Sequence, residues 1–428
     1  MAPAGTLKVA FYGDDFTGAT DTLATAARAG LRTLLFLQLP TPAQLGAAGA
    51  LDCLGIAGAA RSMGPEEMRA ELEAVGRLFA GLGAPVIHYK TCSTFDSAPH
   101  VGSIGVALRA LQPHTGSAFV PIVGGQPSLR RYCLFGNLFA AAGEEICRID
   151  RHPTMRKHPV TPMHEADLRL HLEKQGLAGV GSVAFTDYAK TPALLDAQLD
   201  AQTAGPVLMD VASGTDLQTI GRLIWERAVR APLLAVGASS VVQALAAHWH
   251  LEDGASLPGI APAQGPVLVL AGSLSPMTAR QVSAATSYQH VSLDVVRLAS
   301  DDRYLWQRAS DMAALLRDGF HVLASTSDGA EASLVEGRTT ARACGVLLAR
   351  VLAAAPVKRL GIAGGDTSSH AVQALDAWGL SYQAQLAPGV ALCRLHSDDR
   401  QLDGLEIMLK GGQMGDESLL EVLLSGKP

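Results

Sequence analysis

The sequence predicts an α/β protein of two domains, each built on a largely parallel sheet flanked by helices. Short apolar segments alternate with longer segments of helical periodicity, which is typical of doubly wound parallel sheets. A glycine-, proline- and alanine-rich stretch without periodicity follows at 251–265. We interpret this stretch as a linker between a first domain at 1–250 and a second domain at 266–428.

Strands of the first domain are expected where apolar residues run together, and helices where they recur at helical spacing. The strands expected are 7–12, 32–37, 51–57, 85–89, 118–123, 182–186, 206–211 and 232–236. The helices expected are an alanine-rich one that follows the polar stretch 13–21 and ends at about Gly30, then 65–79, 100–111, 191–203, 214–229 and 239–249. Polar clusters follow several of these strands, at the edge where parallel sheets bind ligands.

The same alternation resumes after the linker. The strands expected are 267–270, 289–295, 319–325, 359–363, 381–385, 389–395 and 404–410. The helices expected are one after each of the first and fourth of these strands, together with 302–317, 338–354 and a final helix.

The segment 124–162 breaks the pattern. It is rich in basic and aromatic residues, and its proline steps disfavour a continuous helix. We interpret it as a long irregular excursion. Two roles remain open for it, a lid and a subunit contact.

The composition excludes several classes of protein. A hydrophobic fraction of 48% with 17% charged residues predicts a soluble globular chain, and a net charge of −6 argues against nucleic-acid or membrane-surface partners. No segment is long and apolar enough for a membrane helix, and no signal peptide is recognised. The six cysteines lack C-x-x-C spacing, so they predict neither zinc nor redox chemistry. A cytoplasmic protein with reduced thiols is expected.

Carboxylates gather where the first strand ends and its helix begins. Asp14, Asp15 and Asp21 lie there with Thr17. One acid is expected only to cap the helix and to interact with its dipole. Asp15, followed by Phe-Thr-Gly-Ala, suits a general base or a hydroxyl-binding acid. We predict a catalytic role for Asp15 and substrate binding by Asp14 and Thr17.

A second polar set follows the strand 85–89. Lys90 is followed by Ser93, Thr94 and Asp96. The lysine could pair with a carboxylate or with a transferred phosphoryl group. We predict that Lys90 is catalytic, that the three other residues bind substrate, and that Arg61 joins Lys90 in holding a carboxylate.

A glycine turn follows the strand 359–363. Gly364 and Gly365 precede Asp366 and Thr367, and a helix comes next, capped by Thr367 or Ser368. Backbone N–H groups and a helix dipole directed at one point suit a phosphate. Asp366 could hold a magnesium ion there.

Two further turns repeat this pattern. Ser273 and Ser275 follow the strand 267–270, and Lys410 and Gly412 belong to the turn after the strand 404–410. Several glycine- and hydroxyl-rich turns in one domain predict a nucleotide site. One domain for a polyol or sugar acid and one for a nucleotide is the architecture of a small-molecule kinase.

Two alternative functions stay open at this point. One is a hydroxy-acid dehydrogenase, although the glycine pattern at 179–184 lies before a strand and not after one. The other is a non-catalytic protein that binds a sugar acid. The sequence contains no G-x-x-x-x-G-K-[ST] motif, which excludes a P-loop enzyme.

Six motifs, taken in order, resemble the four-carbon acid sugar kinase family over essentially the whole chain. They are D-D-x-T-G-A (Asp14 to Ala19), K-x-C-S-T-F-D-S (Lys90 to Ser97), H-P-x-T-P-M (His158 to Met163), G-S-x-S-x-x-T (Gly272 to Thr278), G-G-D-T-S (Gly364 to Ser368) and K-x-G-x-x-G (Lys410 to Gly415).

This resemblance implies that the first domain binds the acid sugar and the second binds ATP, with Mg²⁺, and that the active site lies in the cleft between them. It implies phosphorylation of the terminal hydroxyl of a 3-oxo-tetronate, threonate or erythronate. The form K-x-C-S-T-F-D-S is similar to the 3-oxo-tetronate kinase branch, whereas erythronate and threonate kinases tend to have K-x-D-S-T-x-R-G. The partners expected are a small sugar acid and a second copy of the chain in a homodimer.

Two segments depart from the 3-oxo-tetronate pattern. Residues Gly125 to Arg131 stand where that branch usually has P-x-x-G-R-T, and the final turn is K-G-G-Q-M-G in place of K-S-G-N-F-G. The first departure concerns the substrate. The second keeps the lysine and two glycines, so ATP binding is still expected.

Overall fold

The computed structural model describes residues 7–158, 160–202, 205–251, 259–272, 275–326 and 337–427, with only the backbone described at residues 337, 338 and 366. The described residues fold into two compact units. The first unit draws on Met1–Asp14, Thr25–Thr33 and Thr41–Ala255, and the second on Asp15–Ala24, Leu34–Pro40 and Ser256–Pro428. A short N-terminal part of the chain therefore belongs to the second unit.

The first unit contains a parallel sheet in the order β3-β1-β4-β11-β5-β10-β9. Its strands are β1 (Val9–Gly13), β3 (Cys53–Ala57), β4 (Val86–Lys90), β5 (Val120–Gly124), β9 (Gly181–Val183), β10 (Pro206–Asp210) and β11 (Leu233–Gly237). Most of these strands are buried along their whole length, as expected for a sheet covered on both faces.

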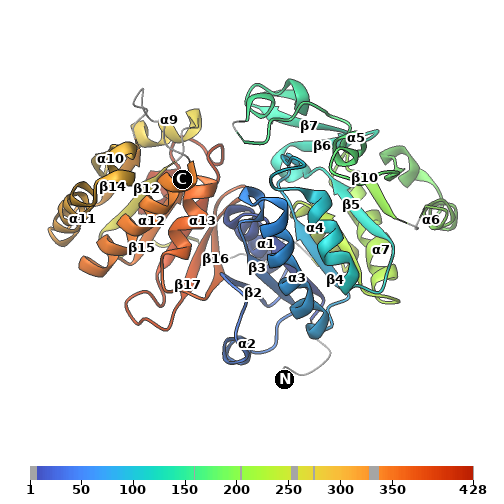
Figure 1. The fold of residues 1–428 in the computed structure, drawn as a ribbon, viewed down its shortest axis with the longest axis horizontal. Coiled ribbons are helices and arrows are strands. Elements are labelled where there is room, and N and C mark those ends of the chain that lie inside the picture. The colour runs from blue at the N-terminus through green and yellow to red at the C-terminus, as the bar shows by residue number, and fades with distance from the viewer. Residues whose placement is uncertain are drawn as a thin grey trace. The chain divides into compact units, whose positions relative to one another are not determined.

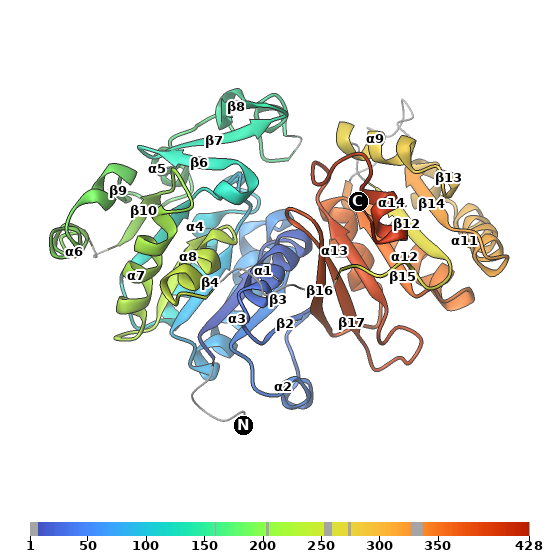
Figure 2. The same cartoon turned by 180° about the vertical axis from the view of Figure 1, so that it is seen from behind.

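Helices cover both faces of this sheet. Those assigned wholly to the first unit are α2 (Pro42–Ala48), α3 (Pro65–Leu82), α4 (Ile104–Leu111), α5 (Leu168–Glu173), α6 (Pro192–Asp200), α7 (Asp216–Ala228) and α8 (Ser240–His248). Figure 1 shows α3 and α4 in front of the sheet, and Figure 2 shows α7 and α8 in front of its other face. Helix α4 starts later than the sequence predicts, because Ser103 caps it with its side chain.

The segment 124–162 contains a small antiparallel sheet that the sequence analysis did not predict. Its strands are β6 (Arg131–Leu134), β7 (Asn137–Ala142) and β8 (Glu145–Arg148). A bridge between Cys133 and Val211 joins it to the carboxyl end of β10, beyond which it lies in Figures 1 and 2. The excursion therefore lies at the carboxyl-end edge of the sheet of the first unit, and its role as a lid or a subunit contact stays a prediction.

The second unit contains a mixed sheet in the order β13-β14-β12-β15-β18-β17-β16-β2. Its strands are β2 (Thr33–Phe36), β12 (Val267–Ala271), β13 (Gln289–Leu293), β14 (Val322–Thr326), β15 (Arg359–Ala363), β16 (Gly379–Ala387), β17 (Val390–His396) and β18 (Glu406–Lys410). The first five strands of the order are parallel, whereas β17 and β16 run antiparallel to their neighbours. Strand β2 closes this edge through the pairs Phe36–Gly379 and Leu35–Leu380.

The helices of the second unit also lie on two faces. They are α9 (Pro276–Ala284), α10 (Val295–Ser300), α11 (Asp302–Arg317), α12 (Gly337–Ala354), α13 (Gly365–Gln373) and α14 (Leu419–Ser425). Helix α1 (Phe16–Arg28) contributes its first residues, Phe16 to Ala24, to this unit. The predicted α/β class is confirmed. The boundary at 251–265 stays a prediction, and residues 252–258 of that stretch lie outside the described residues.

Candidate active site

The predicted substrate residues of the first unit surround the carboxyl ends of three neighbouring strands. Gly13, Lys90 and Gly237 occupy the same level on β1, β4 and β11. The Asp14 amide donates to the Lys90 carbonyl at 3.0 Å, and the Thr91 amide donates to the Gly237 carbonyl at 2.9 Å. The register of the sheet thus brings the residues after β1 and β4 together.

Asp14, which is buried, and Arg61, which is partly buried, form an ion pair at this edge. The Arg61 Nη2 lies 2.7 Å from Asp14 Oδ1, and the Arg61 amide donates to the Asp14 carbonyl at 3.0 Å. Thr91 Oγ1 donates to Asp14 Oδ2 at 3.3 Å. Asp14 therefore fixes the end of β1, and the charge of Arg61 is already matched by a carboxylate.

The loop 90–97 is buried although it is polar. Lys90, Ser93, Thr94 and Asp96 all have low exposure, and the Thr94 hydroxyl donates to the Asp96 carboxylate. Phe95 between them has a φ of 54°, a left-handed conformation that is rare for an aromatic residue. The predicted substrate residues of this loop thus share one compact, constrained turn.

Asp15 and Thr17 belong to the second unit, unlike Asp14. Asp15 Oδ1 accepts from the Gly18 amide at 2.9 Å, and Oδ2 accepts from Thr17 Oγ1 at 2.5 Å. Asp15 therefore caps α1, the role expected of one acid in this cluster. Its Oδ2 would lie 3.7 Å from a Cβ placed on Gly365, so the carboxylate stands beside the turn after β15.

Three glycine turns, at 272–278, 364–368 and 410–415, follow adjacent strands of the second unit. Ala271, Ala363 and Lys410 occupy the same level on β12, β15 and β18. The Gly272 amide donates to the Ala363 carbonyl, and the Gly364 amide to the Lys410 carbonyl, both at 2.9 Å. The three turns that the sequence predicts for the nucleotide are therefore side by side.

Glycine is required at two positions in these turns. Gly364 has a φ of 124°, which other residues rarely adopt. A Cβ on Gly272 would lie 2.3 Å from Thr367 Oγ1. Helix α13 already begins at Gly365, with Gly364 at the N-cap, so the prediction that Thr367 or Ser368 caps this helix is wrong. The glycine pair lets the helix start at the strand end.

Lys410 is the buried cation of this region. Its side chain is fully buried, and Nζ donates to Thr278 Oγ1 at 3.0 Å and to the Gly412 carbonyl at 3.3 Å. Burial lowers the pKa of Lys410 from 10.5 to about 8. Ser275 and Thr278 also donate to the Gly412 carbonyl, which fastens the last turn to the start of α9. A buried ammonium with only neutral partners among these contacts suits an anionic ligand.

Sequence reasoning missed other residues that shape these turns. Gln281 is buried in α9, and its Nε2 donates to the carbonyls of Met414 and Asp416 at 3.0 and 2.7 Å. No motif marks Gln281, because its role depends on contacts distant in sequence. Ser273 and the side chain of Asp366, which were predicted for nucleotide and metal, lie outside the described residues. Among the described residues, no group of three or more His, Cys, Asp or Glu side chains is arranged to hold a metal ion.

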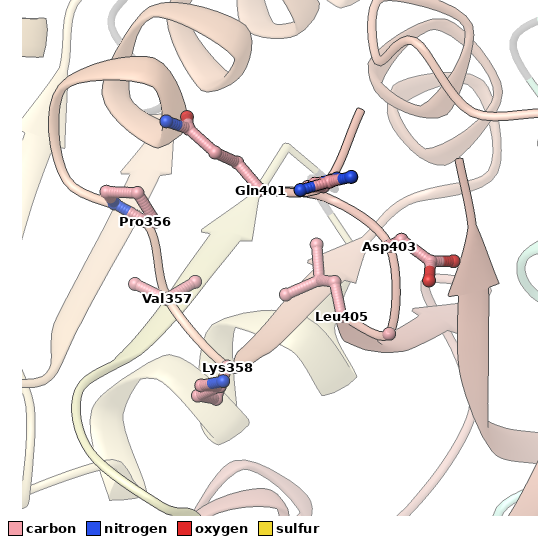
Figure 3. A pocket seen from close by; sticks show the side chains of 8 residues that line it. Pro356, Val357, Lys358, Gln401, Asp403 and Leu405 are labelled. Atoms are coloured by element: carbon pink, nitrogen blue, oxygen red, sulfur yellow. The ribbon is translucent and has the colours of Figure 1, made fainter. Parts of the chain in front are cut away.

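A surface pocket of the second unit lies away from the three glycine turns. Figure 3 shows its lining: Pro356, Val357, Lys358, Arg400, Gln401, Asp403, Gly404 and Leu405. These residues precede β15 and β18 or stand at their amino ends. In parallel strands the amino ends form the edge opposite the carboxyl ends, so this pocket is not part of the candidate active site.

Comparison with known proteins assigns both halves of the chain. Residues 9–245 match the model of a sugar-binding N-terminal domain, and residues 268–420 match that of a nucleotide-binding C-terminal domain. No helix in the described part of the chain has the length and apolarity needed to span a membrane.

Characterised relatives extend over nearly the full chain. A 3-oxo-isoapionate kinase of Paraburkholderia graminis is 37% identical over 99% of this chain and 95% of its own. A 3-oxo-tetronate kinase of Pseudomonas fluorescens is 31% identical over 88% of each chain. Another from Cupriavidus necator is 30% identical over 96% of this chain and 95% of its own.

Solved structures show the same fold. Haemophilus influenzae protein HI1011 has a TM-score of 0.70 at 25% identity and covers 97% of this chain and 98% of its own. A Salmonella typhimurium protein described as a tRNA synthase has a TM-score of 0.78 at 25% identity, with the same coverage. The relatives named above are kinases, so neither alternative, the dehydrogenase or the non-catalytic binding protein, is favoured. The chain belongs to the four-carbon acid sugar kinase family.

Proposed function

We propose that this protein transfers the terminal phosphoryl group of ATP to the terminal hydroxyl of a 3-oxo sugar acid, and that 3-oxo-isoapionate or a close analogue is the preferred acid. The observation that carries this proposal is the full-length match at 37% identity to a 3-oxo-isoapionate kinase. The 3-oxo-tetronate kinases that match are 28 to 31% identical. The proposed acid therefore differs from the tetronates that the sequence motifs imply.

The departure at 125–131 supports this choice of substrate. The segment follows β5, at the same edge of the sheet as Lys90. Gly125 has a φ of 112°, Gln126 is buried, and the Gln126 amide donates to the Arg131 carbonyl at 2.9 Å. A loop at this edge that differs from the 3-oxo-tetronate kinase pattern would change which acid fits. The 90–97 loop, in contrast, keeps the form that is similar to that branch.

In the first unit, cations would hold the carboxylate of the acid and polar groups its hydroxyls. Lys90 supplies the main positive charge, and Arg61 acts together with Asp14 as a fixed pair. Ser93, Thr94 and Asp96 supply hydrogen-bonding groups in one buried turn. Burial holds the pKa of His88 at about 3, so this neighbour on β4 is neutral and adds no second charge beside Lys90.

In the second unit, the three glycine turns would hold the phosphates of ATP. The residues fit the ligand, because Lys410 is a buried cation and the N-terminus of α13 opens toward the turn. Mg²⁺, when bound, would neutralise phosphate charge, and Asp366 is proposed as its carboxylate ligand because it follows Gly365 in the first turn of α13. Asp366→Asn should raise the Mg²⁺ concentration needed for half-maximal activity.

Asp15 is proposed as the general base. Its carboxylate would accept the proton of the attacking hydroxyl as the new O–P bond forms and the bond to the leaving ADP breaks. Phosphoryl transfer needs little covalent help from the protein, so positioning and charge neutralisation would supply most of the rate. The place of Asp15 beside Gly365 supports this role. The cleft between the domains as the site of transfer stays a prediction.

A coupled assay of ADP release over a panel of acids tests the proposal. The panel contains 3-oxo-isoapionate, 3-oxo-tetronate, threonate and erythronate. We expect the highest kcat/KM for 3-oxo-isoapionate, by about tenfold or more, because a mismatched substituent commonly changes transition-state binding by that much. If none of the four acids supports ADP release, the proposal is contradicted.

The second candidate is 3-oxo-tetronate. The 90–97 loop, which is similar to the 3-oxo-tetronate kinase branch, favours it. A higher kcat/KM for 3-oxo-tetronate in the same assay would select it. Restoring P-x-x-G-R-T in the 125–131 segment should shift the preference toward 3-oxo-tetronate if that segment sets the choice.

We further infer that the enzyme works in the cytoplasm, where ATP is available, and as a homodimer that forms through the small sheet β6–β8. Phe135 and Ile146 on this sheet are 57% and 45% exposed, which is high for large apolar side chains. Light scattering should give twice the chain mass. The double variant Phe135→Ser and Ile146→Ser should move the mass toward a monomer, and an unchanged dimer would exclude this surface.

A further inference from the structure

A buried cluster of three polar side chains lies next to the 90–97 loop in the first unit. Ser97 ends the loop, and His171 and Gln175 come from α5 and the turn after it. The Ser97 Oγ lies 2.9 Å from His171 Nε2, and Gln175 Nε2 lies 2.8 Å from Ser97 Oγ and 3.0 Å from His171 Nε2. All three side chains are at least nine-tenths buried. Such a closed network is stable only when its donors and acceptors match.

The directions of these hydrogen bonds follow from their partners. Gln175 Nε2 can only donate and gives one proton to Ser97 Oγ, while the single proton of the Ser97 hydroxyl goes to the Phe95 carbonyl. Burial lowers the pKa of His171 to about 4, which keeps the ring neutral at physiological pH. The neutral ring lies against Ser97 Oγ and Gln175 Nε2 through its Nε2 atom.

The cluster acts on the most constrained residue of the loop. Phe95 is fully buried and has a left-handed backbone with φ of 54°. Its carbonyl accepts from Ser97 Oγ at 2.9 Å, and Ser97 Oγ is in turn held by Gln175 and His171. A left-handed bulky residue costs free energy and persists only where its surroundings hold it. Thr94 and Asp96 flank Phe95, so holding this backbone also fixes both of them.

Gln175 links the same cluster to helix α4, which packs on the sheet of the first unit. Its Oε1 accepts from the Ile104 amide at 2.8 Å, at the start of α4. A Cβ on Gly105 would lie 2.1 Å from the Gln175 carbonyl, so the two segments are in direct contact. The loop is thus anchored to α4 and α5, and not only to its own strand.

We propose that His171 and Gln175 are positioning residues for recognition of the sugar acid: they hold the Phe95 backbone so that Thr94 and Asp96 meet the acid in a fixed geometry. The inference rests on the proposed function, in which the 90–97 loop binds the acid. Neither residue needs to touch the substrate. Their effect on catalysis passes through the loop.

The test compares substitutions of His171 with a purely structural control. His171→Phe keeps a planar ring but removes the Nε2 atom that contacts Ser97 and Gln175, and His171→Asn restores a polar side chain that can form hydrogen bonds at this position. We expect His171→Phe to raise the KM for the acid about tenfold, the effect of losing roughly two net hydrogen bonds that hold the loop. The KM for ATP should change by less than about twofold, and His171→Asn should recover part of the loss.

Ser97→Ala provides a milder second variant in case His171→Phe does not fold. It removes one donor to the Phe95 carbonyl and should raise the KM for the acid about threefold, with ATP unaffected. Val75→Ala, which truncates a buried side chain of α3, is the control. It should lower the melting temperature without separating the two KM values.

Two outcomes would overturn the inference. If His171→Phe and Ser97→Ala lower the melting temperature but leave the KM for the acid unchanged, as Val75→Ala does, the cluster is only structural. Lys90→Met separates this failure from a failure of the proposed function. If Lys90→Met raises the KM for the acid while the His171 variants do not, only the positioning role is lost. If Lys90→Met has no effect either, the loop does not bind the acid and both proposals fall.

Discussion

The two groups of predicted site residues are built in different ways. In the first unit, side chains make up the predicted site, and they are paired with one another: Asp14 with Arg61, Thr94 with Asp96, and Ser97 with His171. In the second unit, backbone turns after three adjacent strands make up the predicted site, and Lys410 is a fully buried cation beside them. Binding of the acid by the first unit should therefore respond to changes of charge and hydrogen bonding. Binding of ATP by the second unit should respond to changes of side-chain volume.

This difference has a physical reason. A sugar acid presents hydroxyls in a particular stereochemistry, and side chains can be placed to match each of them. A triphosphate presents repeated anionic oxygens, which backbone N–H groups and a helix N-terminus bind without any particular side chain. Specificity for the acid and affinity for the nucleotide thus depend on separate properties of the chain.

The largest effect is expected from Asp15→Asn, which tests a carboxylate located beside the backbone turns. Asparagine caps helices about as well as aspartate, so α1 should be preserved. A positioned base is typically worth ~10²–10⁴-fold, so kcat should fall at least about a hundredfold while ATP affinity stays nearly constant. Steady-state kinetics and calorimetry measure the two quantities. A near-normal kcat in a folded variant would move the role to Asp366 or Asp96.

The next largest effect is expected from Lys90→Met, which tests charge in the first unit. Removing a buried charged donor costs about 2 kcal/mol, so the KM for the acid should rise roughly thirtyfold while that for ATP stays the same. Lys190→Met is the control, because Lys190 is an exposed partner of Asp187 in the same unit. Equal rises in the KM for the acid and in the KM for ATP would show that the charge of Lys90 does not act on the acid alone.

Gly365→Val tests volume in the second unit. A Cβ at Gly365 would approach only Asp15 Oδ2, at 3.7 Å, so the protein itself should accommodate the side chain. Any loss then reflects the approach of a ligand to the backbone. ATP should bind about tenfold more weakly by calorimetry, a loss of about 1.4 kcal/mol. Gly259→Val, at a glycine of the same unit with open space around it, is the control. Unchanged ATP affinity in Gly365→Val would contradict a backbone-built site.

The smallest effect is expected from pH, and it tests the cation of the second unit. The folded pKa of Lys410 is about 8, below its usual 10.5. A bound phosphate favours the charged lysine, so binding takes up a proton, and ATP affinity should fall about fivefold between about pH 7 and pH 9. Lys410→Met should abolish this dependence.

The free energy of unfolding should respond in the opposite direction. Between about pH 8 and pH 10.5 the unfolded chain binds more protons at this lysine than the folded chain, so its contribution to stability rises with pH. Denaturant unfolding of the protein without nucleotide measures this term. A parallel fall of both stability and affinity would exclude Lys410 as the titrating group.

The sequence predicted most of the parallel strands because each is a continuous apolar run. It did not predict β6, β7 and β8, whose residues are largely half-exposed and whose sequences show no clear alternation of polar and apolar residues. The turn that joins β6 to β7 is Phe135-Gly136, both with positive φ, and a phenylalanine there gives no turn signal. Local patterns were therefore sufficient where burial was complete and insufficient where it was partial.

The candidate site also has features that the sequence predicted and features that it did not. The glycine turns were predicted because strand, turn and helix follow one another directly in sequence. His171 and Gln175 were not, because their partner Ser97 lies more than seventy residues away, and a lone His or Gln has no local signature. The place of Asp15 beside Gly365 was also missed, since it depends on a contact between distant parts of the chain.

The second unit is assembled from three separate stretches of chain, and this has a consequence for how the protein can be divided. A polypeptide that begins after the 251–265 stretch would lack β2, which pairs with β16, and the Asp15 side chain beside Gly365. It would expose an unpaired strand edge, which promotes aggregation. A cut at the apparent boundary should thus yield an insoluble C-terminal fragment, and restoring residues 15–40 through a circular permutation should rescue its solubility.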